Sequence, residues 1–146
     1  MAGIEGAKTT ARNRFPGKVS NVLSGPAMSL VTLTAHGYPV IAAVTTQSVQ
    51  DLNLKTDDSV VALVKATETM LAKADAAGLK ISARNKIPAR ITDIRQGSAM
   101  TALSLTADDL QMTAVITRHA AEELGFREGE SVTAFFKATD VVLETA

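Results

Sequence analysis

Apolar and polar residues alternate along the chain in short runs that end at glycine or other turn residues. The runs GKVSNVLSG (17–25), MSLVTLTAHG (28–37) and YPVIAAVTT (38–46) have this period of two, which is typical of β-strands with one buried face. The next apolar run, SVVALVKATETMLA (59–72), is long enough for one bent strand or two short ones. The pattern therefore predicts a series of consecutive strands.

The period changes between the third and the fourth of these runs. In QSVQDLNLKTDD (47–58), Val49 and Leu52 stand at helical spacing, and the segment ends in a polar turn. Three strands, a short helix and then one long or two short strands are the order of a five-stranded OB-type barrel. We therefore predict an all-β fold with one short helix in this part of the chain.

The whole series occurs a second time, 72 residues further along the chain. Ala-Arg-Asn at 11–13 returns at 83–85, each time with a proline three residues after the asparagine. About a third of the positions from 10 to 74 are identical at this offset without a gap, which marks a tandem duplication. The sequence thus predicts two OB-like five-stranded barrels, in domains 8–72 and 80–146. Because the linker is short and each unit buries little surface alone, we expect the barrels to touch and to associate further.

The composition excludes several classes of function. The 15 Lys and Arg balance the 15 Asp and Glu, so no basic surface indicates nucleic acid or an anionic membrane as a partner. Four Phe, one Tyr and no Trp offer few platforms for stacking single-stranded bases. Cysteine is absent, which excludes disulfides, thiolate metal ligands and cysteine nucleophiles. The N-terminus lacks the apolar core of a signal peptide and no apolar run approaches the roughly 18 residues of a membrane span, so we expect a cytoplasmic protein.

Catalytic motifs are absent from the sequence as well. The two histidines, His36 and His119, stand at non-equivalent positions of the duplication. No nucleophile-elbow, metalloprotease or P-loop pattern occurs. We therefore expect a binding protein rather than an enzyme.

The polar residues that are identical in both copies indicate what the barrels bind. Both charged pairs among them are cationic, and no acidic residue is strictly repeated, with Glu68 and Asp140 coming nearest. A site built on this internal symmetry offers hydrogen-bond donors and positive charge without a carboxylate, and therefore suits an anion. The identical polar pairs are Arg12/Arg84, Asn13/Asn85, Thr34/Thr106, Thr45/Thr117, Ser59/Ser131, Lys65/Lys137 and Thr67/Thr139.

Arg12 and Arg84 each follow a hydroxyl two residues earlier, that of Thr10 or Ser82. In an extended segment this spacing places both side chains on one face. The planar guanidinium suits an oxyanion, and the hydroxyl adds a further hydrogen bond. The alternative is that each arginine pairs with a carboxylate of the neighbouring barrel.

Thr45 and Thr117 stand just before the two helical segments. Either they are ordinary N-caps, or the helix start, with its N–H groups and partial positive charge, binds a small anion. Ser48 adds a hydroxyl in the first copy, where the second copy has Ala120.

Lys65 and Lys137 each follow an apolar run, VALV and TAFF respectively. Their spacing leaves two possibilities open, a solvated lysine on the outer face of a strand or an ammonium group that faces the anion site. In the second case the lysines and arginines together compensate the charge of a dianion.

The ordered set of motifs, found twice, resembles the Mop or TOBE domain of molybdate-binding proteins. The set consists of [ST]-A-R-N at the start of the unit, a G-x-x-x-x-V/L strand, an I/V-T-x-x-S/A helix start, L-G-x-x-x-G-E and a closing V-x-A-x-x-K-A-[ST]. The resemblance covers residues 8–72 and 80–146, and two such domains in tandem are similar to the two-domain molbindins.

This resemblance implies a non-catalytic cytoplasmic protein that binds molybdate, and tungstate too, for molybdenum storage and homeostasis. It also implies OB-like domains with three-fold symmetry, so that a two-domain chain forms a homotrimer with oxyanions between domains. Molybdenum would be held only as its oxyanion, without direct metal ligands. The implied oxyanion-binding residues are Thr10, Ala11, Arg12, Thr45, Ser48, Lys65, Ser82, Ala83, Arg84, Thr117 and Lys137.

Two other interpretations of the chain stay open. The chain also fits a ligand-sensing module of a molybdate-responsive regulator or transporter that acts through a partner, or a structural trimer whose cations form ion pairs.

The chain also departs from the family pattern. The first copy has LNLKTDD where the second has LGFREGE, so it lacks the two glycines of this turn. Ala120 stands where the family has a serine, so we expect one donor fewer in the second site.

Overall fold

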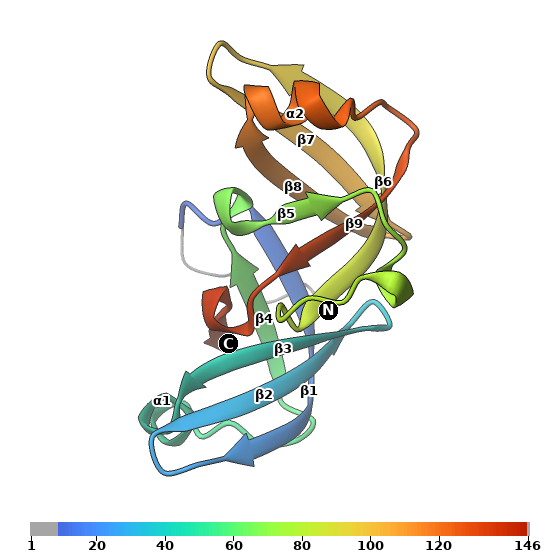
Figure 1. Ribbon diagram of the computed structural model, residues 1–146. Coiled ribbons are helices and arrows are strands. Elements are labelled where there is room, and N and C mark those ends of the chain that lie inside the picture. The colour runs from blue at the N-terminus through green and yellow to red at the C-terminus, as the bar shows by residue number, and fades with distance from the viewer. Residues whose placement is uncertain (1–8, 146) are drawn as a thin grey trace.

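The computed structural model describes residues 9–145 as two curled five-stranded sheets, one above the other (Figure 1). The elements of the first repeat lie mainly in the lower barrel and follow the predicted order. They are β1 (Asn13–Ser24), β2 (Met28–Ala35), β3 (Tyr38–Thr45), α1 (Thr46–Asp51) and β4 (Ser59–Val64). The second repeat has the same order in β6 (Asn85–Gln96), β7 (Met100–Ala107), β8 (Leu110–Thr117), α2 (Arg118–Leu124) and β9 (Ser131–Phe136). The predicted all-β, OB-like fold is confirmed.

One boundary differs from the sequence prediction. β1 begins at Asn13 rather than at residue 17, because its first residues pair with β4, as in Pro16 opposite Val61. The helices α1 and α2 have only 6 and 7 residues, and each is followed by turns, as the polar ends of the segments predicted. Within residues 9–145, neither helix has the length and apolar character needed to cross a membrane.

The long final run of each repeat forms two strands separated by a 3-10 turn. In the first repeat η1 (Ala66–Glu68) precedes β5 (Met70–Ala72), and in the second η3 (Ala138–Asp140) precedes β10 (Val142–Thr145). A further 3-10 turn, η2 (Ala76–Gly78), lies in the linker.

The last strands are exchanged between the barrels. β5 pairs with β9 of the second repeat and β10 pairs with β4 of the first, which gives the sheet orders β10-β4-β1-β2-β3 and β5-β9-β6-β7-β8. Figure 1 shows β5 in the upper barrel and the C-terminus at the lower one. Each barrel therefore contains residues of both repeats, which is a closer contact than the short linker led us to expect.

The interiors of the two barrels form one continuous apolar core. Alternate residues of β2 and β7 are buried, as the period of two predicts, whereas every residue of β4 after Ser59 is buried. Phe15 of β1 and Phe136 of β9 are fully buried and stack on each other, with ring centroids 5.7 Å apart. Because one ring comes from each repeat, this contact joins the two cores.

Two buried asparagines join the barrels through hydrogen bonds. The amide of Asn13 donates to the carbonyl of Thr113 (2.9 Å) and accepts from its N–H (2.6 Å). Asn85 bonds the backbone of Ile41 in the same way, at 2.8 and 2.7 Å. Asn13 also donates to the hydroxyl of Thr69 (2.9 Å). The repeated asparagine of the Ala-Arg-Asn motif thus pairs with a strand of the opposite barrel, which no sequence pattern indicated.

Candidate functional site

A cavity of about 260 Å³ brings together three of the residues implied by the sequence. Thr10 and Ala11 lie in the segment before β1, and Lys65 follows the last residue of β4. The strand pairing of β1 with β4, in which Asn13 is opposite Val64, places the two segments side by side. Leu63 and Val142 form apolar parts of the wall, and Thr9 completes the rim with Glu68 and Asp140.

Arg12 is not among the residues that line this cavity. Its guanidinium turns back along its own segment and donates to the carbonyls of Thr9 (3.1 Å) and Thr10 (3.3 Å). Arg84 does the same with the carbonyls of Ile81 (2.6 Å) and Ser82 (3.1 Å). Within residues 9–145 neither arginine has a carboxylate at ion-pair distance, so the alternative of a pair with the neighbouring barrel is not found in the single chain.

The two lysines precede the 3-10 turns η1 and η3. Both side chains are exposed, and Lys65 lines the cavity. Lys65 is therefore an exposed lysine that lines the same cavity as Thr10 and Ala11.

Two carboxyl groups, those of Glu68 and Asp140, also line the cavity. Burial, a hydrogen bond to Asp140 and the charge of Asp140 raise the pKa of Glu68 from its ordinary value, while Lys65 and Lys137 act in the opposite direction. The expectation of a site without carboxylates is therefore wrong for this cavity. The sequence comparison set this pair aside because it counted only identical residues. The exchange of the last strands brings the turns η1 and η3, which contain Glu68 and Asp140, to the same cavity.

A second hollow of about 300 Å³ adjoins the first. It contains Thr45 and Ser48, with Met28, Leu52 and the exchanged β10 as apolar walls. Val142 lines both hollows, so they meet at β10. The larger part of the lining is apolar, in contrast to the polar residues that the sequence singled out.

Both candidate threonines are helix N-caps, as one of the two interpretations predicted. The hydroxyl oxygen of Thr45 accepts from the N–H of Ser48, and that of Thr117 from the N–H of Ala120, each at 3.1 Å. The hydroxyls of Thr45 and Ser48 lie 2.7 Å apart, a bond that the second repeat lacks because residue 120 is alanine. Of the remaining second-repeat candidates, Ser82, Arg84, Thr117 and Lys137 are exposed and Ala83 is buried.

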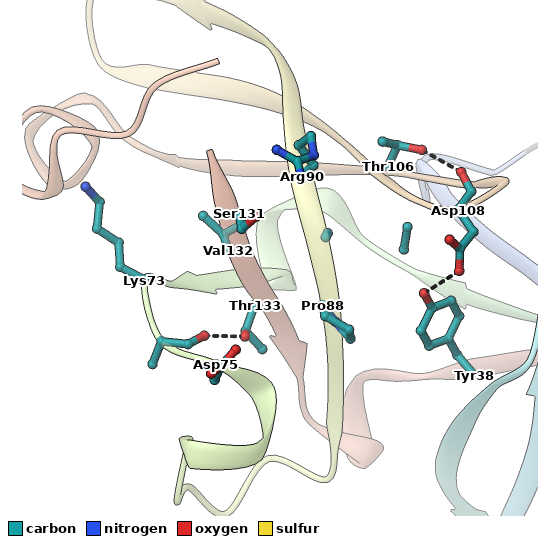
Figure 2. A pocket seen from close by; sticks show the side chains of 13 residues that line it. Tyr38, Lys73, Asp75, Pro88, Arg90, Thr106, Asp108, Ser131, Val132 and Thr133 are labelled. Atoms are coloured by element: carbon teal, nitrogen blue, oxygen red, sulfur yellow. Dashed lines mark hydrogen bonds between the residues drawn. The ribbon is translucent and has the colours of Figure 1, made fainter. Parts of the chain in front are cut away.

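A larger hollow, about 610 Å³, lies elsewhere, beside the linker and strands β6 and β9 (Figure 2). It contains none of the candidate residues. Its polar groups are engaged with one another or nearby: Tyr38 donates to Asp108 (2.8 Å), which raises the pKa of Tyr38, and Arg90 donates to the carbonyl of Gly129 (2.7 Å). Lys73 is ion-paired with Glu130 at 3.0 Å. We therefore place the candidate site at the smaller cavity of Thr10 and Lys65.

Histidine and carboxylate side chains do not form a metal centre in the described part of the chain. No group of three or more such residues there could hold a metal ion. The arrangement of hydroxyl, N–H and ammonium groups suits a ligand that accepts hydrogen bonds through its own oxygens.

The two curled barrels with exchanged last strands define a tandem OB-like β protein. The model of the TOBE domain matches residues 9–71 and 81–143, and the chain belongs to this family. The resemblance inferred from the repeated motifs is thus confirmed.

Relatives with this architecture are named for molybdenum or molybdate. The solved structure of the cytoplasmic molybdate-binding protein ModG, with molybdate bound, has a TM-score of 0.90 and 32% identity over 96% of this chain and 100% of that one. The molybdenum-pterin-binding protein MopA of Rhodobacter capsulatus is 33% identical over 93% of this chain and 52% of its own length. The molybdenum transport protein ModE of Herbaspirillum seropedicae is 33% identical over 93% of this chain and 51% of its own length. The chain thus spans about half the length of these curated relatives.

Proposed function

We propose that this protein binds molybdate, and tungstate as well, as a cytoplasmic non-catalytic protein of molybdenum storage and homeostasis. The observation that carries the proposal is the cavity in which Thr10, Ala11 and Lys65 meet. The full-length similarity to molybdate-bound ModG supports the choice of anion.

The groups around the cavity suit a tetrahedral dianion. The Thr10 hydroxyl and the Lys65 ammonium group are donors, and the latter is charged. The N–H of Ala11 now donates to the hydroxyl of Thr9 at 3.2 Å, a long bond that an anion oxygen can replace. Arg12 lies on the same segment with its side chain exposed, and we expect it to turn from the carbonyl of Thr10 to a bound oxyanion.

Assembly into a homotrimer would complete such sites. Apolar side chains are exposed at repeat-related positions: Met28 and Leu52 (49% and 40% exposed) line the second hollow, and Met100 and Leu124 (43% and 42%) are their equivalents in the second repeat. Single exposed apolar residues are common, but the same pair on both barrels indicates a surface that another copy covers. Light scattering should give about three times the chain mass of 15.3 kDa, and a monomer at micromolar concentration would contradict sites shared between chains.

A second candidate function is a ligand-sensing module that acts through a partner. It is favoured by the fact that the chain matches only about half of relatives named for molybdenum transport. Pull-down experiments from cell extract, with and without molybdate, separate a sensor from a storage protein, since only the sensor has a molybdate-dependent partner.

Equilibrium dialysis with molybdate tests the proposed function directly. We expect a fixed stoichiometry per chain, competition by tungstate and weaker competition by sulfate, whose smaller size leaves donors unpaired at a cost of about 1–3 kcal/mol each. Bound molybdate should also stabilise the fold by about 2.7 kcal/mol at a hundred times its dissociation constant. Equal effects of molybdate, sulfate and phosphate would indicate non-specific attraction by surface cations and contradict the proposal.

A further inference from the structure

Glu68 and Asp140 occupy equivalent positions in the two repeats and meet where the repeats meet. Each is the last residue of its 3-10 turn, η1 or η3. The exchange of β5 and β10 carries these turns across the barrel junction, so η1 packs against β8 and η3 against β3. Both side chains are half-buried and line one cavity, where partial burial and a hydrogen bond with Asp140 raise the pKa of Glu68.

This hydrogen bond requires a proton. Two ionised carboxylates have only acceptor oxygens and repel each other, so one of the pair must be protonated for the bond to form. The same partial burial, bond and charge raise the pKa of Glu68. With its proton the pair has a charge of −1, and without it a charge of −2.

The cations that face the pair are the two candidate lysines. Lys65 and Lys137 are the positive groups that act on Glu68. Strand β8 has no charged residue, and the only titratable residue of β3 is Tyr38. In β10, Glu144 is ion-paired with Arg14 at 3.0 Å, and Arg12 is directed to backbone carbonyls.

We propose that the Glu68–Asp140 pair is a proton-linked specificity element of the oxyanion cavity, which binds a dianion tightly only while the pair retains its proton. The inference rests on the proposed function. Glu68, Asp140 and Lys65 line the same cavity, so the charge of the pair is felt by any anion bound there.

The sign of the effect follows from the charges. At low pH the protonated pair leaves one positive charge of the two lysines uncompensated, which attracts a dianion. As the pH rises through the raised pKa of Glu68, the second negative charge neutralises the lysines and repels the ligand, and the affinity falls. By linkage, a bound dianion raises the pKa of Glu68 further, so binding takes up protons.

The test measures molybdate affinity from about pH 5 to about pH 8 in wild type and in Glu68→Gln, whose side chain is neutral throughout. We expect the wild-type affinity to fall about ten-fold over this range, equivalent to a change of one pKa unit on binding. The ratio of wild-type to Glu68→Gln affinity removes the anion's own protonation, which is common to both. Calorimetry in two buffers of different ionisation enthalpy should detect proton uptake only in the wild type.

Two further variants serve as a replicate and a control. Asp140→Asn removes the other member of the pair and should also flatten the profile, which keeps the inference testable if Glu68→Gln is unstable. Glu128→Gln changes an exposed glutamate away from the cavity and should retain the wild-type profile. If wild type, Glu68→Gln and Asp140→Asn bind molybdate with the same pH profile, the inference is overturned and the proposed function stands. If the wild type binds no molybdate at any pH, the proposed function fails and the inference with it.

Discussion

In the second repeat, the turn after α2 has glycine at both residues of positive φ, Gly125 (φ 63°) and Gly129 (φ 85°). The first repeat has the same backbone conformation with Asn53 (φ 50°) and Asp57 (φ 76°) at these positions. Asparagine and aspartate tolerate the left-handed region better than most side chains, but they do so with strain that glycine lacks. The turn of the first repeat therefore keeps the same shape without the two glycines, but its backbone is more strained than that of the second repeat.

A second difference lies beneath the helices. In the first repeat the buried hydroxyl of Ser29 is 2.8 Å from that of Thr46, which donates to the carbonyl of Gly25. The second repeat has Arg118 in place of Thr46, and within the described chain the buried hydroxyl of Thr101 has no hydrogen-bond partner. The first repeat is thus strained in the turn after α1, and the second has a buried hydroxyl without a partner. Both repeats nevertheless adopt the same fold, so the fold does not require identical local hydrogen bonds.

The largest expected effect on the free energy of unfolding comes from replacing the two asparagines that join the barrels. Asn13→Ala removes bonds to Thr69 and Thr113 and should lower the free energy of unfolding by about 3 kcal/mol, because it leaves buried backbone groups unpaired. Asn85→Ala removes only the two bonds to Ile41 and should cost about 2 kcal/mol. Urea denaturation measures both values. A loss below about 0.5 kcal/mol in either variant would show that the amide is not needed to join the barrels.

The next effect compares the two lysines. Lys65→Ala and Lys137→Ala should each weaken molybdate binding at its own site on the order of ten-fold, because a charge-assisted bond contributes roughly 1.5–3 kcal/mol. Lys18→Ala, at an exposed position of β1 outside the cavity, is the matched control and should bind as the wild type does. Unchanged affinity and stoichiometry in both lysine variants would assign them to the solvated surface.

A smaller effect tests the strain in the turns. Gly129→Ala should lower the free energy of unfolding by about 1 kcal/mol, because alanine is forced to positive φ. Asp57→Gly should change it by less than about 0.5 kcal/mol, since the relief of strain is offset by the greater freedom of glycine in the unfolded chain. Thermal unfolding of the two variants beside the wild type gives the comparison. Equal losses would mean that the first repeat is not strained there.

The smallest effect concerns the unpaired hydroxyl. Thr101→Val keeps the shape and removes a buried group without a partner, so it should stabilise the protein by about 0.5 kcal/mol. Ser29→Ala, at the equivalent position, should instead cost about 1 kcal/mol, because Thr46 loses a partner. If Thr101→Val is destabilising, a water molecule is the missing partner of the hydroxyl.

The strands and helices could be predicted from the sequence because they depend on local periodicity. Val31 and Leu33 alternate with exposed or half-buried neighbours in β2 as the pattern requires, and Thr45 caps α1 as its position before the helical segment suggests. The duplication then predicted the second barrel from the first, and in the structure β1 and β6 have the same length.

The exchange of the last strands could not be predicted in this way. Because Leu71 and Leu143 occupy equivalent positions, each strand fits either barrel equally well on its sequence pattern. For the same reason, the meeting of Glu68 with Asp140 was not foreseen. The orientation of Arg12 toward carbonyls of its own segment is set by local backbone geometry, which the motif does not contain.

Because the last strands are exchanged, the linker raises the effective concentration of each repeat near the other. Two separate repeats would need to meet in solution before β5 could pair with β9 and β10 with β4. The short linker makes this encounter an intramolecular step at roughly millimolar effective concentration. A protein cleaved once in the linker should therefore stay assembled at high concentration and dissociate on dilution. When it dissociates, both barrels should lose a strand at once, because neither half contains all five strands of a sheet.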